Sequence, residues 1–179
     1  RGQDFDLQVA EHSWQWRGVD GQGQTVQLTD IPLLNLPMEN AALALQAYVA
    51  LGLPWQPSAV LQGLQHAHIT GRLQSVAIAY QGRSLQLLLD VAHNPHAAQY
   101  LAQRLASQPI QGRRLAVLGM LNDKDVHGVL SSMVDQFSDW AVAALPSPRS
   151  CTAQALESAL SEQGAEVVAY SSIGAAIEA

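Results

Sequence analysis

The sequence contains a single cysteine, Cys151, among its 179 residues. An intramolecular disulfide is therefore excluded, and the composition suits a reducing compartment such as the cytoplasm. No apolar run approaches the ~20 residues that a membrane-spanning helix requires, so we expect no membrane association. The sequence also has no basic segment followed by an apolar stretch near its start, and no secretory signal is predicted.

Basic residues are few as well. Nine Lys and Arg residues stand against fifteen Asp and Glu residues, which gives a formal net charge of −6 at pH 7. The nine are scattered rather than clustered, and both features argue against a nucleic-acid-binding surface. Single arginines are better suited to contacts with one phosphate or one carboxylate. We therefore expect small-molecule partners and no nucleic acid. We also expect a monomer.

Almost half of the residues, 48%, are apolar, and the mean hydropathy is +0.04. These values are typical of a globular protein. The length allows one domain with a sizeable core, or one domain and part of another.

The most informative stretch is 85–98, where an apolar run too short for a helix ends in Asp90. We interpret the run as a buried strand that delivers a carboxylate at its carboxyl end. His93 follows in a polar turn, and Asn94-Pro95 is a typical helix start. Ligands bind at the carboxyl ends of strands in open α/β sheets, so these side chains are candidates for chemistry. The spacing leaves open that Asp90 only caps the helix and that His93 only faces solvent.

The first 70 residues predict a domain segment of strands followed by helices. Trp14 and Trp16, two residues apart in one alternating run, share a strand face and are expected to pack in the core. Gly52 and Pro54 end the first helix. The predicted elements are an antiparallel meander over 5–28 and helices over 39–51 and 57–66.

The second part, residues 71–179, predicts an α/β domain. A hairpin pairs 76–80 with 85–91 around a turn at 81–84. Strands and amphipathic helices alternate from there, which predicts a mostly parallel sheet with helices on both faces. The predicted elements are helix 95–107, strand 114–119, helix 125–137, strand 140–145, helix 152–163 and strand 166–170.

Four short motifs occur in the chain: Pro-Met-Glu-Asn-Ala-Ala at 37–42, Gly-Arg-Leu-Gln at 71–74, Asp-Val-Ala-His-Asn-Pro at 90–95 and Gly-Met-Leu-Asn-Asp-Lys-Asp at 119–125. In order and spacing they resemble segments of the folylpolyglutamate synthase and dihydrofolate synthase family, within the Mur ligase superfamily. The resemblance covers about 36–149, and four motifs in one order are far more specific than one.

This resemblance implies roles for four residues. Asn40 would contact the adenine of ATP, although a polar side chain there also commonly trims a helix end. Arg72, next to a hinge at Gly71, would reach across the domain cleft to the ATP phosphates, the alternative being a solvated arginine. Asp90 would bind the ribose of ATP or the incoming L-glutamate, and His93 would bind L-glutamate.

Three further charged residues lie on the same predicted rim. Asp123 and Lys124 follow a strand, and Arg149 follows the next one. The resemblance implies a supporting role at the cleft, whereas the residues taken alone indicate a charged loop before a helix cap. We predict no metal site here: His93 and His96 are separated by a proline and have no third ligand nearby.

The family's fold and activity follow as expectations. Residues 71–179 would form a Rossmann-like Mur ligase C-terminal domain, truncated at its end, and 1–70 would end the central ATPase domain. The parent would be an ATP-dependent ligase that adds L-glutamate to dihydropteroate or folate through an acyl phosphate. The sequence has no Gly-x-x-x-x-Gly-Lys-Ser/Thr phosphate loop. We expect that loop and the Mg²⁺ ligands in an upstream domain, and we expect this fragment alone to be inactive.

Two other functions stay open. One is a stand-alone nucleotide- or anion-binding module without ligase activity, which the missing phosphate loop favours. The other is a Mur-type peptidoglycan precursor ligase. Mur ligases proper resemble Asp-Ser-Lys-Ala-Thr-Asn where this chain has Asp-Val-Ala-His-Asn-Pro, so the folate branch is the better match.

Overall fold

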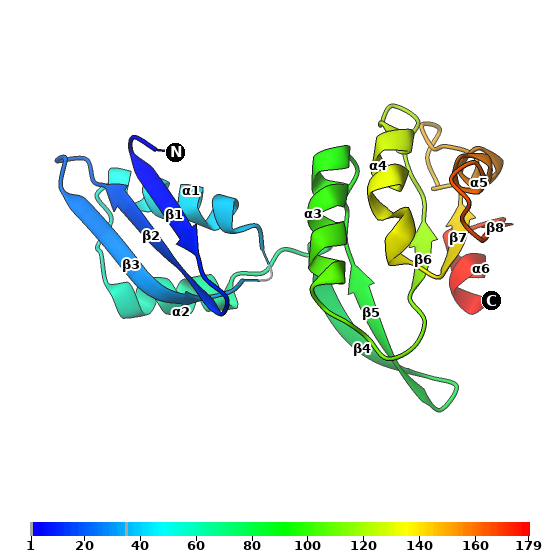
Figure 1. Cartoon of the computed structure of the whole chain (residues 1–179), viewed down its shortest axis with the longest axis horizontal. Helices are drawn as coiled ribbons and strands as arrows, with labels where there is room; N and C mark the ends of the chain where they lie inside the picture. The colour runs from blue at the N-terminus through cyan, green and yellow to red at the C-terminus, as the bar shows by residue number, and fades with distance from the viewer. Residues whose placement is uncertain (1, 35) are drawn as a thin grey trace. The chain divides into compact units, whose positions relative to one another are not determined.

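The computed structural model describes residues 2–34 and 36–179 and divides the chain into two compact units, Arg1–Asp90 and Val91–Ala179. Figure 1 shows the order of the elements along the chain. The division falls after Asp90, whereas the sequence places a domain boundary at residue 70. The hairpin that lies between these two positions belongs to the first compact unit.

The first unit opens with the predicted antiparallel meander. Its strands are β1 (Phe5–Val9), β2 (Ser13–Val19) and β3 (Thr25–Pro32), in that order across the sheet. Trp14 and Trp16 on β2 are each only 1% exposed, which confirms that both pack in the core. The indole Nε1 of Trp14 also donates a hydrogen bond of 3.1 Å to the carbonyl of Pro32, which ties β2 to the end of β3.

Two helices cover this meander. They are α1 (Met38–Ala50) and α2 (Pro57–His66), at the predicted places. The apolar side chains of α1 recur at helical spacing and are buried against β1 and β2. These side chains are Ala41, Ala42, Leu45 and Val49. Burial of one apolar stripe is what holds a surface helix of this length on a sheet.

The predicted hairpin is confirmed as an antiparallel pair of β4 (Gln74–Tyr80) and β5 (Arg83–Leu89). Its turn is shorter than predicted, because Gln81 and Gly82 alone connect the strands. The interpretation of β5 as a buried strand is wrong: every residue of β5 is exposed. The hairpin forms a sheet of two strands. An apolar run in the sequence does not show whether another helix or strand covers that run.

The second unit contains the predicted parallel sheet. The strands β6 (Leu115–Leu118), β7 (Asp139–Ala143) and β8 (Val167–Tyr170) lie in this order, with both neighbouring pairs parallel. On the central strand four successive residues, 140–143, are buried. Because neighbouring side chains on a strand point to opposite faces, this strand is covered on both faces. The α/β fold class is thereby confirmed.

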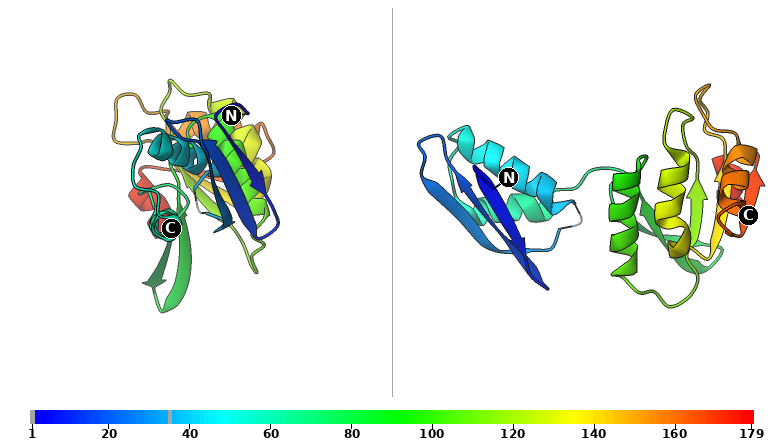
Figure 2. Two further views of the ribbon diagram at one scale, coloured as in Figure 1. Left: turned by 90° about the vertical axis from the view of Figure 1, so that its left-hand side faces the viewer. Right: turned by 45° about the horizontal axis from the view of Figure 1, so that its top comes forward.

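The α-helices of the second unit begin at side-chain caps. Asn94 accepts a hydrogen bond from the N–H of Ala97, and Asp125, Thr152 and Ser172 cap later helices in the same way. Helices α3 and α4 lie side by side, as Figures 1 and 2 show. The predicted helix over 125–137 is split, since its last turn is a 3₁₀ helix. The elements are α3 (Pro95–Ala106), α4 (Val126–Met133), η1 (Val134–Gln136), α5 (Ala153–Ser161) and α6 (Ile173–Glu178).

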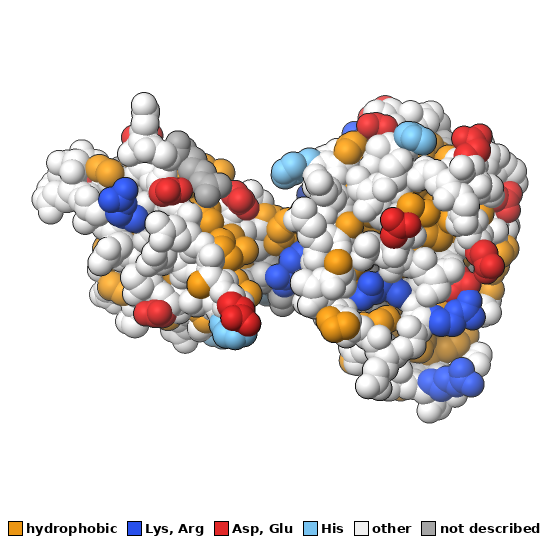
Figure 3. Space-filling model, viewed as in Figure 1, with side chains coloured by type: hydrophobic (Ala, Val, Ile, Leu, Met, Phe, Trp, Pro, Cys, Tyr) orange, Lys and Arg blue, Asp and Glu red, His pale blue; other side chains and the backbone are white. Residues whose placement is uncertain are grey.

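Figure 3 shows the basic side chains of one face as separate groups with acidic groups among them. In the part of the chain that the structure describes, no helix has the length and apolar character needed to span a bilayer.

Candidate functional site

In the first unit, the predicted phosphate contact Arg72 lies in a tightly turned segment before β4. Its neighbours Gly71 and Leu73 have φ angles of 70° and 44°, in the left-handed region, which a leucine rarely adopts. The N–H of Leu73 donates a 2.8 Å hydrogen bond to Oδ2 of Asp90, the residue directly after β5. Arg72 therefore directly precedes Leu73, whose N–H is bound by Asp90, another predicted site residue.

The carboxylate of Asp90 does not cap the helix that follows it in the sequence. The N-cap of α3 is Asn94, whose side chain accepts from Ala97, so the cap alternative for Asp90 is wrong. Asp90 is half-buried and joins the two open ends of the hairpin. The sequence offers no signal for this contact, because its partner is a backbone N–H seventeen residues away.

Asn40 lies in the first turn of α1, with an exposed side chain. Its backbone N–H donates to the carbonyl of Pro37 at 3.0 Å, and the helix has no side-chain N-cap. The side chain is thus presented to solvent at a helix start. That position agrees with a ligand contact and equally with a surface residue.

In the second unit, His93 is exposed in the turn before α3. Its Nδ1 lies 2.9 Å from the carbonyl oxygen of Val91. A carbonyl only accepts hydrogen bonds, so Nδ1 carries the proton in this contact. The other ring nitrogen, Nε2, is consequently an acceptor in the neutral imidazole and a donor in the imidazolium. The contact between Nδ1 and the carbonyl of Val91 thus determines whether Nε2 accepts or donates a hydrogen bond in each protonation state of the ring.

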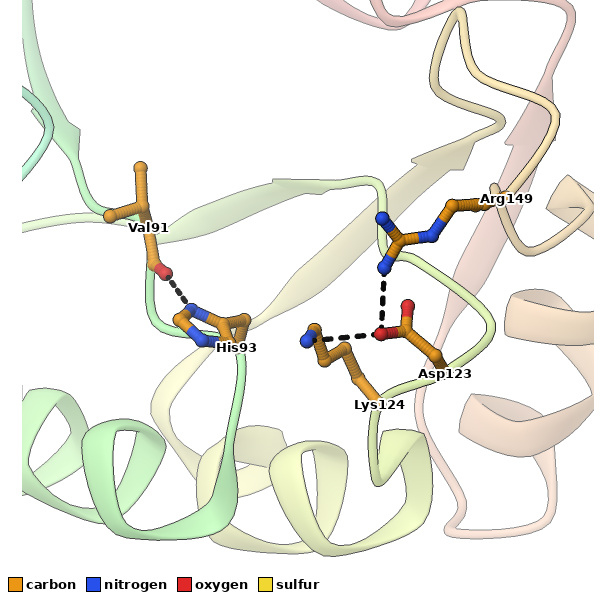
Figure 4. Close-up of polar contacts among 5 residues, drawn as sticks. All are labelled: Val91, His93, Asp123, Lys124 and Arg149. Carbon is orange, nitrogen blue, oxygen red and sulfur yellow. Dashed lines mark hydrogen bonds and ion pairs between the residues drawn. The ribbon is translucent and has the colours of Figure 1, made fainter.

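The charged rim residues of the second unit come together around one oxygen atom. Nη2 of Arg149 donates to Oδ2 of Asp123 at 2.8 Å, and Nζ of Lys124 lies 3.2 Å from the same oxygen. The hydrogen bond from Lys124, together with the guanidinium of Arg149, holds the pKa of the Asp123 carboxyl below its usual value. Figure 4 shows this cluster and His93 near the starts of the helices α4 and α3.

The two rim loops of this cluster are also paired through their backbones. The N–H of Asn122 donates to the carbonyl of Arg149, and the N–H of Cys151 donates to Met120, each at 2.8 Å. Ser150 Oγ accepts from the N–H of Leu145 at 2.7 Å. This pairing was missed from the sequence, where the two loops are separate segments with no pattern that links them.

The structure therefore groups the predicted residues other than Asn40 in two sets. Arg72 and Asp90 lie at the open end of the hairpin in the first unit. His93, Lys124 and the Asp123–Arg149 pair lie on one rim of the second unit. Among the described residues, no group of three or more His, Cys, Asp or Glu side chains is arranged to hold a metal ion.

Known proteins match this chain closely. The family described as Mur ligase, glutamate ligase domain, matches residues 71–179. The dihydrofolate synthase/folylpolyglutamate synthase of Escherichia coli K12 is 40% identical over 156 residues, which cover 87% of this chain and 35% of that protein. The chain spans about a third of the length of the curated relatives it matches.

Solved structures match nearly the full length of this chain. Escherichia coli FolC in complex with DHPP and ADP has a TM-score of 0.85 at 36% identity, covering 99% of this chain and 40% of that one. A bifunctional folylpolyglutamate synthase/dihydrofolate synthase with Mn, AMPPNP and L-glutamate bound has a TM-score of 0.77 at 37% identity, covering 96% of this chain and 39% of that one.

Proposed function

This chain belongs to the Mur ligase family through its glutamate ligase domain, and we propose that it is the C-terminal part of an ATP-dependent ligase that joins L-glutamate to dihydropteroate or folate. The family assignment agrees with the resemblance in the four motifs. The observation that carries the proposal is the match of nearly the whole chain to FolC solved with ADP, and to a related enzyme solved with L-glutamate.

The proposed reaction has two steps. The γ-phosphoryl group of ATP is transferred to a carboxylate oxygen of the pteroate or folate substrate, which gives an acyl phosphate and ADP. The α-amino nitrogen of L-glutamate then attacks the activated carbonyl carbon, the amine loses its proton and inorganic phosphate leaves. Chemistry of this kind depends on neutralising phosphate charge and on placing the amine, more than on a side-chain nucleophile.

We assign ATP contacts to Asn40 and Arg72, and a contact with ribose or L-glutamate to Asp90. An arginine suits this role because its guanidinium presents a fork of donors that matches phosphate oxygens. The half-buried Asp90 holds the turn that carries Arg72, through Leu73. Asp90 would therefore act on ATP binding in part by fixing the position of Arg72.

L-glutamate is assigned to His93 on the rim of the second unit. Because Nδ1 is engaged by the carbonyl of Val91, Nε2 is the nitrogen left for the substrate. In the neutral imidazole Nε2 accepts from the α-ammonium of the amino acid, and in the imidazolium it donates to a carboxylate. Lys124 and Arg149 supply positive charge on the same rim.

The divalent metal is assigned to the remainder of the ligase. The described residues form no cluster of metal ligands, and Arg72 is a cation, which suits phosphate oxygens rather than Mg²⁺. No step is therefore attributed to a metal held by this chain. We expect the ligase in the cytoplasm, where ATP is available and the thiol of Cys151 stays reduced.

The full-length ligase that contains this chain tests the proposal. Purified enzyme is assayed for ADP release with ATP, L-glutamate and either dihydropteroate or folate, omitting one substrate at a time. We expect ADP release to require all three and a product heavier by one glutamyl residue in mass spectrometry. ADP release that ignores L-glutamate, or no glutamylated product from either acceptor, would overturn the proposal.

A further inference from the structure

The rim of the second unit is held together by its own backbone. The loop after β6 and the loop after β7 are joined by the two backbone hydrogen bonds between Asn122 and Arg149 and between Cys151 and Met120. An isolated antiparallel bridge, Leu121 with Ser150, lies between them. The backbones that carry Asp123 and Arg149 are therefore fixed relative to each other by main-chain contacts.

Side chains complete this link. Oδ2 of Asp123 accepts from Nη2 of Arg149 at 2.8 Å and faces Nζ of Lys124 at 3.2 Å. Arg149 thus restrains the carboxylate, and the carboxylate restrains the lysine. The side chain of Lys124 is 29% exposed, less than Asp123 at 42% or Arg149 at 61%, so its stem is covered while the pair around it stays accessible. We call these three residues the rim clasp.

The charge balance of the rim clasp leaves it cationic. Two positive groups share one carboxylate, which gives a net charge of +1. An ammonium has three N–H donors, and the contact with Asp123 uses one of them. Lysine loses considerable rotamer freedom when it is immobilised, so a lysine already held in place binds an anion at a lower entropic cost.

We propose that Asp123 and Arg149 are positioning residues that hold the Lys124 ammonium on the rim near His93, where it binds a carboxylate of the amino-acid substrate. This inference rests on the proposed ligase function. Lys124 contacts the substrate, whereas Arg149 acts only through Asp123 and Lys124. The class of ligand follows from the chemistry of the rim. The Lys124 ammonium is a compact positive charge that suits a carboxylate, and the His93 imidazole offers a nitrogen that suits an amine.

The first test measures the position of Lys124 directly and does not depend on activity. Lys124 is the only lysine in the sequence, so reductive ¹³C-methylation of this chain gives one lysine signal in NMR besides the terminal amine. We expect the Lys124 signal to sharpen and to move toward that of free dimethyl-lysine in Asp123→Asn and in Arg149→Ala. The control is Arg113→Ala, which removes an exposed arginine paired with Asp139 in the same unit and should leave the signal unchanged. A wild-type signal that already matches free dimethyl-lysine would overturn the positioning role.

The second test is a double-mutant cycle in the full-length ligase. Lys124→Met should raise the KM for L-glutamate about tenfold or more, the loss expected for a charge-assisted hydrogen bond. Arg149→Ala should raise it about two- to fivefold, as expected for an exposed ion pair. Arg149→Ala should add nothing in the Lys124→Met background, and the KM for ATP should stay unchanged throughout. Arg149→Lys, which keeps the charge, should restore part of the loss.

The outcomes separate the two proposals. Effects of Arg149→Ala and Lys124→Met that multiply would mean that Arg149 binds the substrate itself, which overturns the positioning role. An equal rise in the KM for ATP would do the same. If the unaltered ligase shows no glutamate-dependent ADP release, the proposed function fails, whereas the NMR result still decides whether the rim clasp holds Lys124.

Discussion

The N–H of Leu73 donates a 2.8 Å hydrogen bond to Oδ2 of Asp90, which closes the open end of the β4–β5 hairpin. Leu73 is buried and has a positive φ, a backbone conformation that costs a residue with a side chain roughly 1–2 kcal/mol. The contact with Asp90 helps to offset that cost. A side chain predicted to bind a ligand is therefore also part of the structure around Arg72.

Replacing Asp90 should consequently lower stability as well as activity. We expect Asp90→Ala to reduce the free energy of unfolding by about 1–3 kcal/mol, because the N–H of Leu73 loses its partner. Asp90→Asn keeps an acceptor oxygen and should cost less. Urea denaturation of the two variants measures the difference. Equal stability of Asp90→Ala and the wild-type chain would contradict the structural role.

His93 and Arg72 should affect different substrates in the full-length ligase. His93→Ala should raise the KM for L-glutamate far more than the KM for ATP, and Arg72→Ala should do the reverse. Loss of a charge-assisted hydrogen bond costs roughly 1.5–3 kcal/mol, or about ten- to more than a hundredfold in affinity. Steady-state kinetics with each substrate varied in turn gives the KM for L-glutamate and the KM for ATP of both variants.

Two other residues of the same types serve as controls. His96 is exposed in the first turn of α3, and Arg83 is exposed on β5. His96→Ala and Arg83→Ala should leave both KM values within about twofold, and thermal melts of all four variants check the fold. The assignment of L-glutamate to His93 and of ATP to Arg72 is wrong if the two Ala variants weaken both substrates equally, or if neither has an effect.

The chain alone should not turn over substrate. It has no phosphate loop in its sequence, and its described residues hold no metal cluster. We expect no ADP release from the 179-residue chain with ATP, L-glutamate and pteroate, and weak binding of ATP in calorimetry. The full-length ligase assayed in parallel is the positive control. Robust turnover by the isolated chain would refute the assignment of phosphate and metal binding to the remainder of the ligase.

Sequence reasoning succeeded where the physical cause is local. Asn94 and Asp125 were predicted at helix starts, and both accept the expected N–H three residues later. The apolar stripe of α3 is buried as its 3.6-residue spacing predicts; its members are Ala98, Leu101, Ala102 and Leu105. Capping and periodicity depend on neighbours within a few residues, so a single sequence contains them.

Sequence reasoning failed where the cause lies elsewhere in the chain. The apolar run of β5 looked buried, but burial depends on which elements cover a strand, and this strand is exposed. The link between Asp123 and Arg149 joins residues 26 positions apart, and no periodic pattern encodes it. Helix α6 was not predicted, because six residues are too few to display helical spacing. The candidate residues were therefore named from motifs, while their partners required the structure.

The hairpin turn gives a prediction that separates backbone strain from packing. Gln81 and Gly82 have φ angles of 48° and 75°, as a two-residue turn of type I′ requires. A Cβ on Gly82 would meet no atom within 4 Å, so Gly82→Ala tests the backbone alone. We expect it to cost about 1–2 kcal/mol in urea denaturation. Gln81→Asn should raise stability, because Asn-Gly is the preferred pair in this turn.

Gly63 in α2 is the matched control for that substitution. A Cβ on Gly63 would likewise meet no atom within 4 Å, but the backbone there is helical. Gly63→Ala should therefore stabilise the chain by about 0.5–1 kcal/mol, the opposite sign. Two substitutions of the same size with effects of the same sign would contradict the turn geometry.

The rim clasp should make stability depend on acid pH through Asp123. Lys124 and Arg149 hold the pKa of this carboxyl below its ordinary value of 3.8 in the folded chain. Above that ordinary value the carboxyl is ionised in both states, and the stabilisation is fully present. As the pH falls below it, the unfolded chain takes up the proton first. The stabilisation therefore decreases steadily and is gone once the pH lies below the folded-state pKa. We expect the melting temperature of the wild type to fall toward that of Asp123→Asn over this interval, and the two to differ most above it.

Thermal melts of wild type and Asp123→Asn from strongly acidic to neutral pH, at low and at high salt, measure this dependence. Asp135→Asn controls for the removal of an exposed carboxylate from the same unit. Because the cluster is exposed, added salt should shrink the difference between wild type and Asp123→Asn. A difference in melting temperature that stays constant with pH would mean that Lys124 and Arg149 do not stabilise the ionised carboxylate of Asp123. The contacts of the rim clasp would then contribute nothing to the stability of the fold.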